Sequence, residues 1–166
     1  MSSGYYDEAL SIIRSLGEIA NLMAMFVADK SKFERWKSLD ERSRRREFAP
    51  VKIRLWLEQK GATLVVDERR FGALSAYSIH PSPDTLPQAH NEHGTSTIAP
   101  TYQEAGFLLC LNELARPMAF IGVFSTSLID VSDEIKKTAQ LVSRTLVEHI
   151  GAISAEVQGR PWFSLN

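Results

Sequence analysis

The chain has 166 residues, 44% of them hydrophobic and 23% charged, and its formal net charge is −1 at pH 7. This length and composition are typical of a soluble protein with one buried core, so we expect a single domain over residues 1–166. The one cysteine, Cys110, excludes an internal disulfide and fits a reducing compartment. The first residues, MSSGYYDEALS, are polar and acidic, so no secretory signal is predicted and we expect a cytoplasmic protein.

Residues 5–28 predict a helix that is apolar almost all the way round. Its one narrow polar stripe carries Arg14, Glu18 and Asn21. A cation and a carboxylate four residues apart in a buried helix need partners, so the stripe is either a structural tie or part of a site. The opposite side is predicted to face the core, and it consists of Ile12, Leu16, Ile19 and Met23.

Short sequence signals place the next helices. Ser31 with Glu34, and Ser38 with Glu41, fit the S-x-x-E capping box at a helix start. Pro50 suits a first helical position, Gly61 suits the residue just past a helix end, and Asp67 suits a cap. Residues 64–66 could form a short strand, but three residues alone do not make a sheet. Helices are therefore predicted over 32–37, 39–47, 50–60 and 67–79.

The stretch 106–124 is strongly apolar but contains Glu113, Arg116 and Pro117. A charged residue at the centre of a membrane helix costs roughly 2.5 to 3.5 kcal/mol, so we expect no membrane span here. The pattern instead predicts a central helix of a bundle over 102–124, kinked or broken near the proline.

Ser132 is predicted to cap a last helix that extends to residue 157. Residues 81–101, rich in Pro, Ser, Thr and His, are predicted to form a long loop, and 159–166 a C-terminal tail. The predicted fold class is all-α: an antiparallel bundle of five or six helices with a long loop that contains proline and histidine. Seven apolar residues of this last helix fall on one face: Ile135, Ala139, Val142, Leu146, Ile150, Ile153 and Val157.

Charge is unevenly distributed, because residues 30–54 hold ten basic and four acidic side chains and are therefore +6, against −7 for the remainder. Such a segment can attract a nucleic-acid backbone, with Phe33 and Trp36 available for stacking. It can equally be a solvated helix face or a contact for the acidic half of a second copy. The candidate RNA-binding residues are Arg42, Arg44, Arg45, Arg46, Lys52 and Arg54.

Three short patterns, RSLGE from residue 14, EFAPVKIR from residue 47 and LSAYSIHP from residue 74, resemble the all-helical HEPN-like proteins, which include ribonuclease toxins and abortive-infection relatives. The resemblance implies a helical bundle that dimerises and, in active members, metal-independent cleavage of RNA at a cleft between two copies. Those members carry an arginine and a histidine four to six residues apart on a late helix, and Arg144 and His149 match that spacing. An imidazole can move the proton of a ribose hydroxyl while a guanidinium holds the phosphate. The alternative is a solvated arginine and a histidine at the edge of the core.

A second constellation joins Arg14 and Glu18 to His80, with Tyr77 one turn before that histidine and Asn21 on the same stripe as the charged pair. These residues are candidates for a catalytic His80 and a ligand-binding pocket in which Arg14 receives an anion. A buried Arg–Glu pair that ties two helices together is the alternative.

The sequence leaves three classes of function open. We favour a non-catalytic helical domain that acts through homodimerisation or a protein partner, because the first helix and residues 107–124 hold more apolar surface than one small bundle hides. The alternatives are a HEPN-like endoribonuclease of a toxin–antitoxin or phage-defence system, and a domain that binds a small anionic ligand. No cofactor is expected, and no metal, since His80, His90 and His93 lie in or beside a loop and lack the spacing of a metal site.

Overall fold

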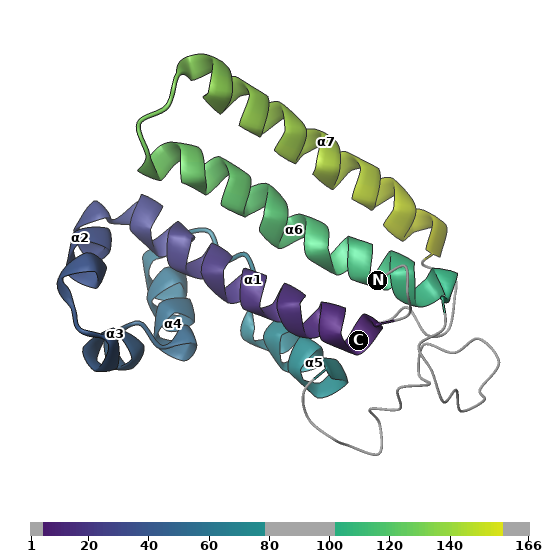
Figure 1. Cartoon of the computed structure of the whole chain (residues 1–166), viewed down its shortest axis with the longest axis horizontal. Coiled ribbons are helices and arrows are strands. Elements are labelled where there is room, and N and C mark those ends of the chain that lie inside the picture. The colour runs from purple at the N-terminus through teal and green to yellow at the C-terminus, as the bar shows by residue number, and fades with distance from the viewer. Residues whose placement is uncertain (1–4, 79–101, 158–166) are drawn as a thin grey trace.

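A computed structural model describes residues 5–78 and 102–157, and these residues form seven helices and no strand (Figure 1). The predicted all-α class is confirmed, although seven helices are present where five or six were expected. Residues 64–66 are not a strand. The helices are α1 (Tyr6–Ala28), α2 (Lys30–Ser38), α3 (Glu41–Glu47), α4 (Pro50–Lys60), α5 (Glu68–Ser78), α6 (Glu104–Leu128) and α7 (Asp133–Val157).

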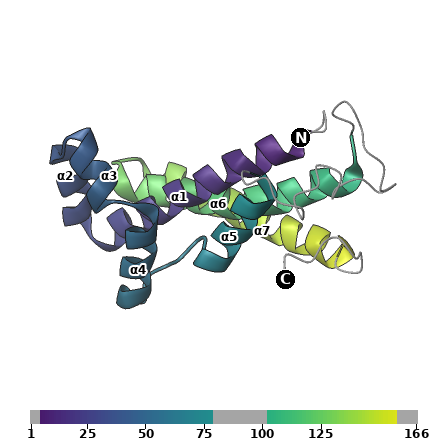
Figure 2. The same ribbon diagram turned by 90° about the horizontal axis from the view of Figure 1, so that it is seen from below.

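The three long helices lie side by side in the order α7, α6, α1, with α6 in the middle (Figure 1). α4 and α5 pack against α1 and lie on the same side of it in both views (Figures 1 and 2). α2 and α3 gather at one end of α1. The first helix is therefore the element that most of the others contact, while α7 packs mainly against α6.

Local signals placed four of the helix ends correctly. Pro50 starts α4, and Gly61 ends it in the left-handed conformation, with φ of 58°. Asp67 caps α5 by accepting a hydrogen bond of 2.7 Å from the Arg70 N–H. Ser132 accepts one of 3.4 Å from the Ile135 N–H at the start of α7.

The two predicted capping boxes are wrong. The cap of α2 is Asp29, whose Oδ1 accepts from the Ser31 N–H at 3.0 Å, and the cap of α3 is Asp40, which accepts from the Ser43 N–H at 3.0 Å. In each case an aspartate two residues from the predicted serine takes the cap position, because a carboxylate is an equally good or better acceptor there.

The predicted inner face of α1 is also wrong. Ile12 is 62% exposed and Ile19 is 47% exposed, whereas Ala9, Leu10, Ile13, Ala20 and Ala24 are buried. Leu16 and Met23, also predicted to face the core, are half-buried. The helix is rotated so that the three alanines face its neighbours together with Leu10 and Ile13.

The reason for this rotation is the close approach of residues 64–66 to α1. A Cβ added to Gly17 would lie only 2.7 Å from Cγ2 of Val66. One turn further along, the side chain of Asn21 is buried and bonds to the same segment: its Nδ2 donates to the Val66 carbonyl at 2.7 Å, and its Oδ1 accepts from the Val65 and Val66 N–H groups at 2.9 and 3.2 Å. These three bonds satisfy backbone groups that would otherwise be buried without partners.

Two apolar clusters form the core on either side of this contact. At the C-terminal end of α1, the ring of Phe26 lies within 5.2 to 6.1 Å of the ring centroids of Phe33, Trp36 and Phe48. The other cluster consists of Tyr6, Ala9, Leu10, Ile13, Leu74 and Cys110. The aromatic contacts hold α2 and α3 against the end of α1.

α6 runs through Pro117 as one continuous helix over residues 104–128, four residues beyond its predicted end. The break expected near the proline is absent, and the proline itself is fully buried. Packing against α1 on one side and α7 on the other holds the helix together despite the backbone hydrogen bond that proline cannot make.

By length and composition, Tyr6–Ala28 of α1 and Gly106–Leu128 of α6 could each cross a membrane. The core helices of a soluble protein meet the same criterion. In this fold 44% and 39% of the residues in their most apolar windows are buried inside the protein. Both helices also carry charged side chains that are paired, Arg14 with Glu18 in α1 and Glu113 of α6 with Arg70.

The contact between Gly17 and Val66 generates a stability prediction. Gly17→Ala is expected to lower the free energy of unfolding by about 1 to 3 kcal/mol, because the new methyl group overlaps the Val66 side chain. Urea denaturation monitored by circular dichroism measures the change.

Gly72 of α5 is the matched control, because a Cβ added there meets nothing within 4 Å. Gly72→Ala should stabilise the protein by about 0.5 to 1 kcal/mol through helix propensity alone. Equal stabilisation by both substitutions would contradict the close approach, and Val66→Ala should recover part of the loss caused by Gly17→Ala.

Candidate functional site

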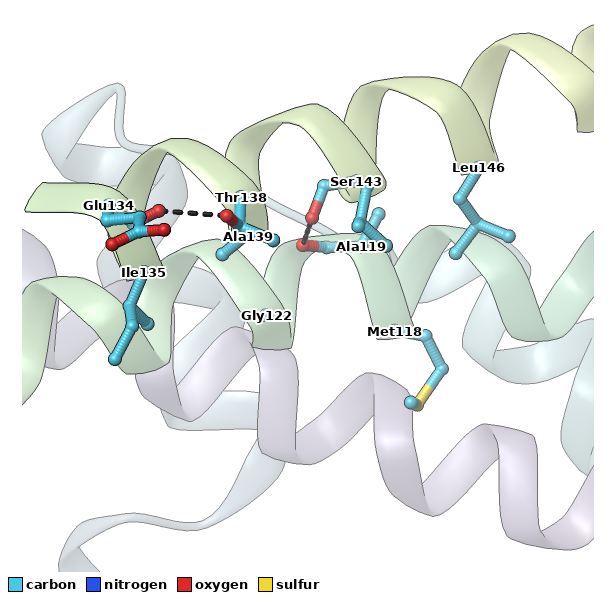
Figure 3. Close-up of a pocket in the computed structure, with 10 residues that line it drawn as sticks. Met118, Ala119, Gly122, Glu134, Ile135, Thr138, Ala139, Ser143 and Leu146 are labelled. Carbon is cyan, nitrogen blue, oxygen red and sulfur yellow. Dashed lines mark hydrogen bonds between the residues drawn. The ribbon is translucent and has the colours of Figure 1, made fainter.

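An apolar groove of about 520 Å³ lies between α6 and α7 (Figure 3). Met118 points from α6 toward α1 in this view, and Ile135 of α7 points toward α6. The α6 side of the groove is lined by Met118, Ala119 and Gly122, and the α7 side mainly by Ile135, Ala139, Val142 and Leu146.

Small residues on α6 let the two helices approach closely at the base of the groove. Ser143 of α7 donates a hydrogen bond to the carbonyl of Ala119 at 2.9 Å. A Cβ added to Gly122 would meet the same hydroxyl oxygen at 3.4 Å. Thr138, the other hydroxyl in the groove, donates to the Glu134 carbonyl at 2.9 Å. Both hydroxyls therefore already have partners, and the groove offers an occupant mainly apolar contacts.

The apolar face of α7 is the face predicted from the sequence, and it is not buried in the core. Over residues 133–152, whose side chains the structure describes, no residue of α7 is buried. Ile135 and Val142 are more than half exposed, while Ala139, Leu146 and Ile150 are half-buried against α6. Ile153 and Val157 lie in α7, but their side chains are outside the described part. The physical reason is that α7 is the outermost of the three long helices and packs mainly against α6 (Figure 1).

Arg14 and Glu18 form the predicted pair, with 3.1 Å between Arg14 Nη2 and Glu18 Oε1, and both side chains are partly exposed. Arg14 Nε also donates to the Ser75 hydroxyl of α5 at 2.8 Å. Asn21, on the same stripe, is bonded to residues 64–66 and is a structural residue. Tyr77 lies in α5, but its side chain is outside the described part, as is all of His80.

Arg144 and His149 are both exposed on α7. Arg144 lies 3.8 Å from the carboxylate of Glu148, and His149 Nδ1 is 2.9 Å from the carbonyl of Thr145. The five-residue spacing places the two side chains about 140° apart around the helix. Within one copy of the chain, they therefore do not point to a common place.

The basic segment is divided between structural and exposed residues. Arg44 stacks on Trp36, 4.4 Å from its ring, and donates to the carbonyls of Trp36 and Leu39, so it holds α2 to α3. Arg45 pairs with Glu41. Arg54 is buried. The exposed candidates for RNA contact are Arg42, Arg45, Arg46 and Lys52.

An ion pair that the sequence analysis missed joins α5 to α6. Arg70 donates through Nε and Nη2 to the two oxygens of Glu113, both at 2.8 Å, in a fork-to-fork arrangement. The carboxylate side chain is 2% exposed. A glutamate in an apolar helix needs a cationic partner, so Glu113 alone indicates that such an ion pair exists. Nothing in the sequence identifies Arg70, rather than another arginine, as the partner.

No three His, Cys, Asp or Glu side chains among the described residues are grouped so as to hold a metal ion, and His90 and His93 lie outside those residues. Comparison with known proteins adds no relationship: no protein-family model, no curated protein and no solved structure matches the chain.

Cys110 is fully buried in α6, and burial raises the pKa of its thiol to about 12. In the unfolded chain a cysteine ionises near roughly 8.5. We therefore expect iodoacetamide at pH 8 to label the native protein at least about a hundredfold more slowly than the urea-unfolded protein, measured by mass spectrometry.

The same difference in pKa has a consequence for stability. Between the two values the unfolded chain loses the thiol proton and the folded protein keeps it, so the free energy of unfolding should fall as pH rises through this interval. Equal labelling of native and unfolded protein would contradict the burial of the thiol.

Proposed function

We propose that the protein is a non-catalytic helical domain whose working form is a dimer, paired through the groove between α6 and α7 and the apolar residues beside it. The observation that carries this proposal is the exposure of α7: it is a helix of 25 residues with an apolar face and no buried residue over 133–152. Contiguous exposed apolar surface of this kind marks interaction sites in soluble proteins.

The mainly apolar lining of the groove favours a helix or another apolar surface as its occupant. Its hydroxyl groups are already bonded to carbonyls, so a polar ligand would find few free donors. A second copy supplies the required surface without a further partner, because a two-fold axis places the same face on both sides of the interface.

The dimer makes a prediction about Val142, which is 59% exposed on the groove side of α7. The unmodified protein is expected to sediment as a dimer at micromolar concentration, and Val142→Glu as a monomer, because a charge would then be buried at the interface. Sedimentation velocity with far-UV circular dichroism separates loss of pairing from loss of folding.

Leu141 provides the control, because it is 54% exposed on the same helix but does not line the groove. Leu141→Glu should leave the dimer intact. A monomeric parent protein at all concentrations reached, or equal dissociation by the two substitutions, would reject the proposed interface.

RNA cleavage, as the resemblance to HEPN-like proteins implies, is our second candidate. The observation in its favour is that His149 is exposed on α7, seven residues after Val142 and so on the same flank of the helix. A dimer through this flank would put two such histidines at the edge of the interface. Arg144 lies on another side of the helix, so it would have to reach a substrate held by the partner copy.

Expression in bacteria tests this second candidate. If the protein cleaves RNA, growth should stop on induction, and His149→Ala and Arg144→Ala should each restore it. Lys137→Ala, at an exposed position of the same helix, should not. Normal growth with the unmodified protein, together with intact cellular RNA, would exclude this activity.

A further inference from the structure

Arg54 of α4 is the one basic side chain in the described residues that is more than nine-tenths buried, with an exposed fraction of 8%. Its guanidinium carbon lies 4.4 Å from the centre of the Phe71 ring of α5. Within the described part of the chain, no carboxylate forms an ion pair with it and no oxygen accepts a hydrogen bond from it. A buried cation without an acceptor is costly, and such groups are normally paired.

A second guanidinium lies over the same ring. The guanidinium carbon of Arg14 is 4.2 Å from the centre of the Phe71 ring, so two cations contact the same phenyl ring. Arg14 is held in place, because its Nε donates to Ser75 and its Nη2 pairs with Glu18. Its Nη1 takes no partner from the described residues. Glu18 pairs with Arg14, and no carboxylate of the described residues forms an ion pair with Arg54, so one ion pair accompanies the two guanidinium groups.

The unpartnered nitrogens of Arg54 can be reached from solvent. Gln103 Oε1 is the one buried side-chain polar atom in the described residues that lacks a hydrogen bond. The guanidinium nitrogens of Arg54 also receive no hydrogen-bond partner from the described residues, but they are not buried and are therefore in contact with solvent. The side chain is thus packed along most of its length and open at its donor end.

From these observations we infer that Arg54 and Arg14 form an anion-binding site beside Phe71, which takes the carboxylate or phosphate group of a small ligand. A planar guanidinium matches both groups, because it can donate two parallel hydrogen bonds to two oxygens. Phe71 packs against both guanidinium groups, and Ser75 and Glu18 hold Arg14 in place. The oxyanion would supply the acceptors that Arg54 lacks. This site is separate from the groove on α7 and does not depend on the proposed dimer.

Titration of the full chain with inorganic phosphate, and separately with acetate, tests the inference. The arginine Nε–Hε signals in a ¹H–¹⁵N spectrum are the readout, and sodium chloride at equal ionic strength is the reference. We expect saturable shifts of the Arg54 and Arg14 signals with at least one of the two oxyanions, and the tighter one identifies the favoured group. Shifts that follow ionic strength alone would overturn the inference.

Variants assign the binding to Arg54. Arg54→Met should weaken oxyanion binding, followed through Arg14, by at least about tenfold, the loss expected for a pair of charge-assisted hydrogen bonds. Arg46→Met removes one exposed charge from α3 and should leave binding unchanged. If Arg54→Met does not fold, Arg54→Lys keeps the charge, loses the planar fork and should still weaken binding. Equal binding by the Arg46 and Arg54 variants would also overturn the inference.

Discussion

The close contact between α1 and residues 64–66 determines how the other helices are arranged. Gly17 removes the side chain that would keep the two segments apart, and Asn21 bonds to the backbone groups that this approach buries. Together they fix the rotation of α1 about its own axis. That rotation turns Arg14 toward Ser75 of α5 and leaves Ile12 and Ile19 exposed on the opposite side.

The charged side chains that pack between the helices have ion-pair or hydrogen-bond partners, with the exception of Arg54. Glu113 has both oxygens bonded by Arg70, and Arg14 has both Ser75 and Glu18, so each burial cost is offset by short charge-assisted bonds. Arg54 is the exception, because its guanidinium lies over the Phe71 ring and no carboxylate among the described residues forms an ion pair with it. A ring face stabilises a cation by about 0.5 to 2 kcal/mol but supplies no oxygen acceptor, so the donor end of Arg54 is left to solvent or to a bound oxyanion.

Most of the helix positions could be predicted from the sequence, because they depend on local chemistry: Pro50, Gly61, Asp67 and Ser132 act within one turn of the backbone. The rotation of α1 could not. A helix that is apolar nearly all round has no single hydrophobic face, so the choice depends on which side permits close packing, and only Gly17 and the alanines hint at it. The pairing of Glu113 with Arg70 depends on the tertiary arrangement in the same way. For α7 the apolar face was predicted correctly, but periodicity does not say whether that face has a partner within the same chain.

The energetics of α7 set a minimum size for the interface that would cover it. Full burial of one valine or isoleucine side chain stabilises a complex by about 1.5 to 3 kcal/mol. Ile135 and Val142 are already partly covered, so each of them contributes less than this range to the free energy of association. Association itself costs about 4 to 15 kcal/mol in lost freedom of motion. A stable dimer therefore needs more than the stripe on α7. Met118, which points from α6 toward α1, extends the apolar surface in the direction of the first helix (Figure 3). Ile12 and Ile19, exposed by the rotation that Gly17 and Asn21 impose, are apolar residues that an interface reaching the first helix would also cover. On this argument, the contact that arranges the core also decides which apolar side chains are left for a partner.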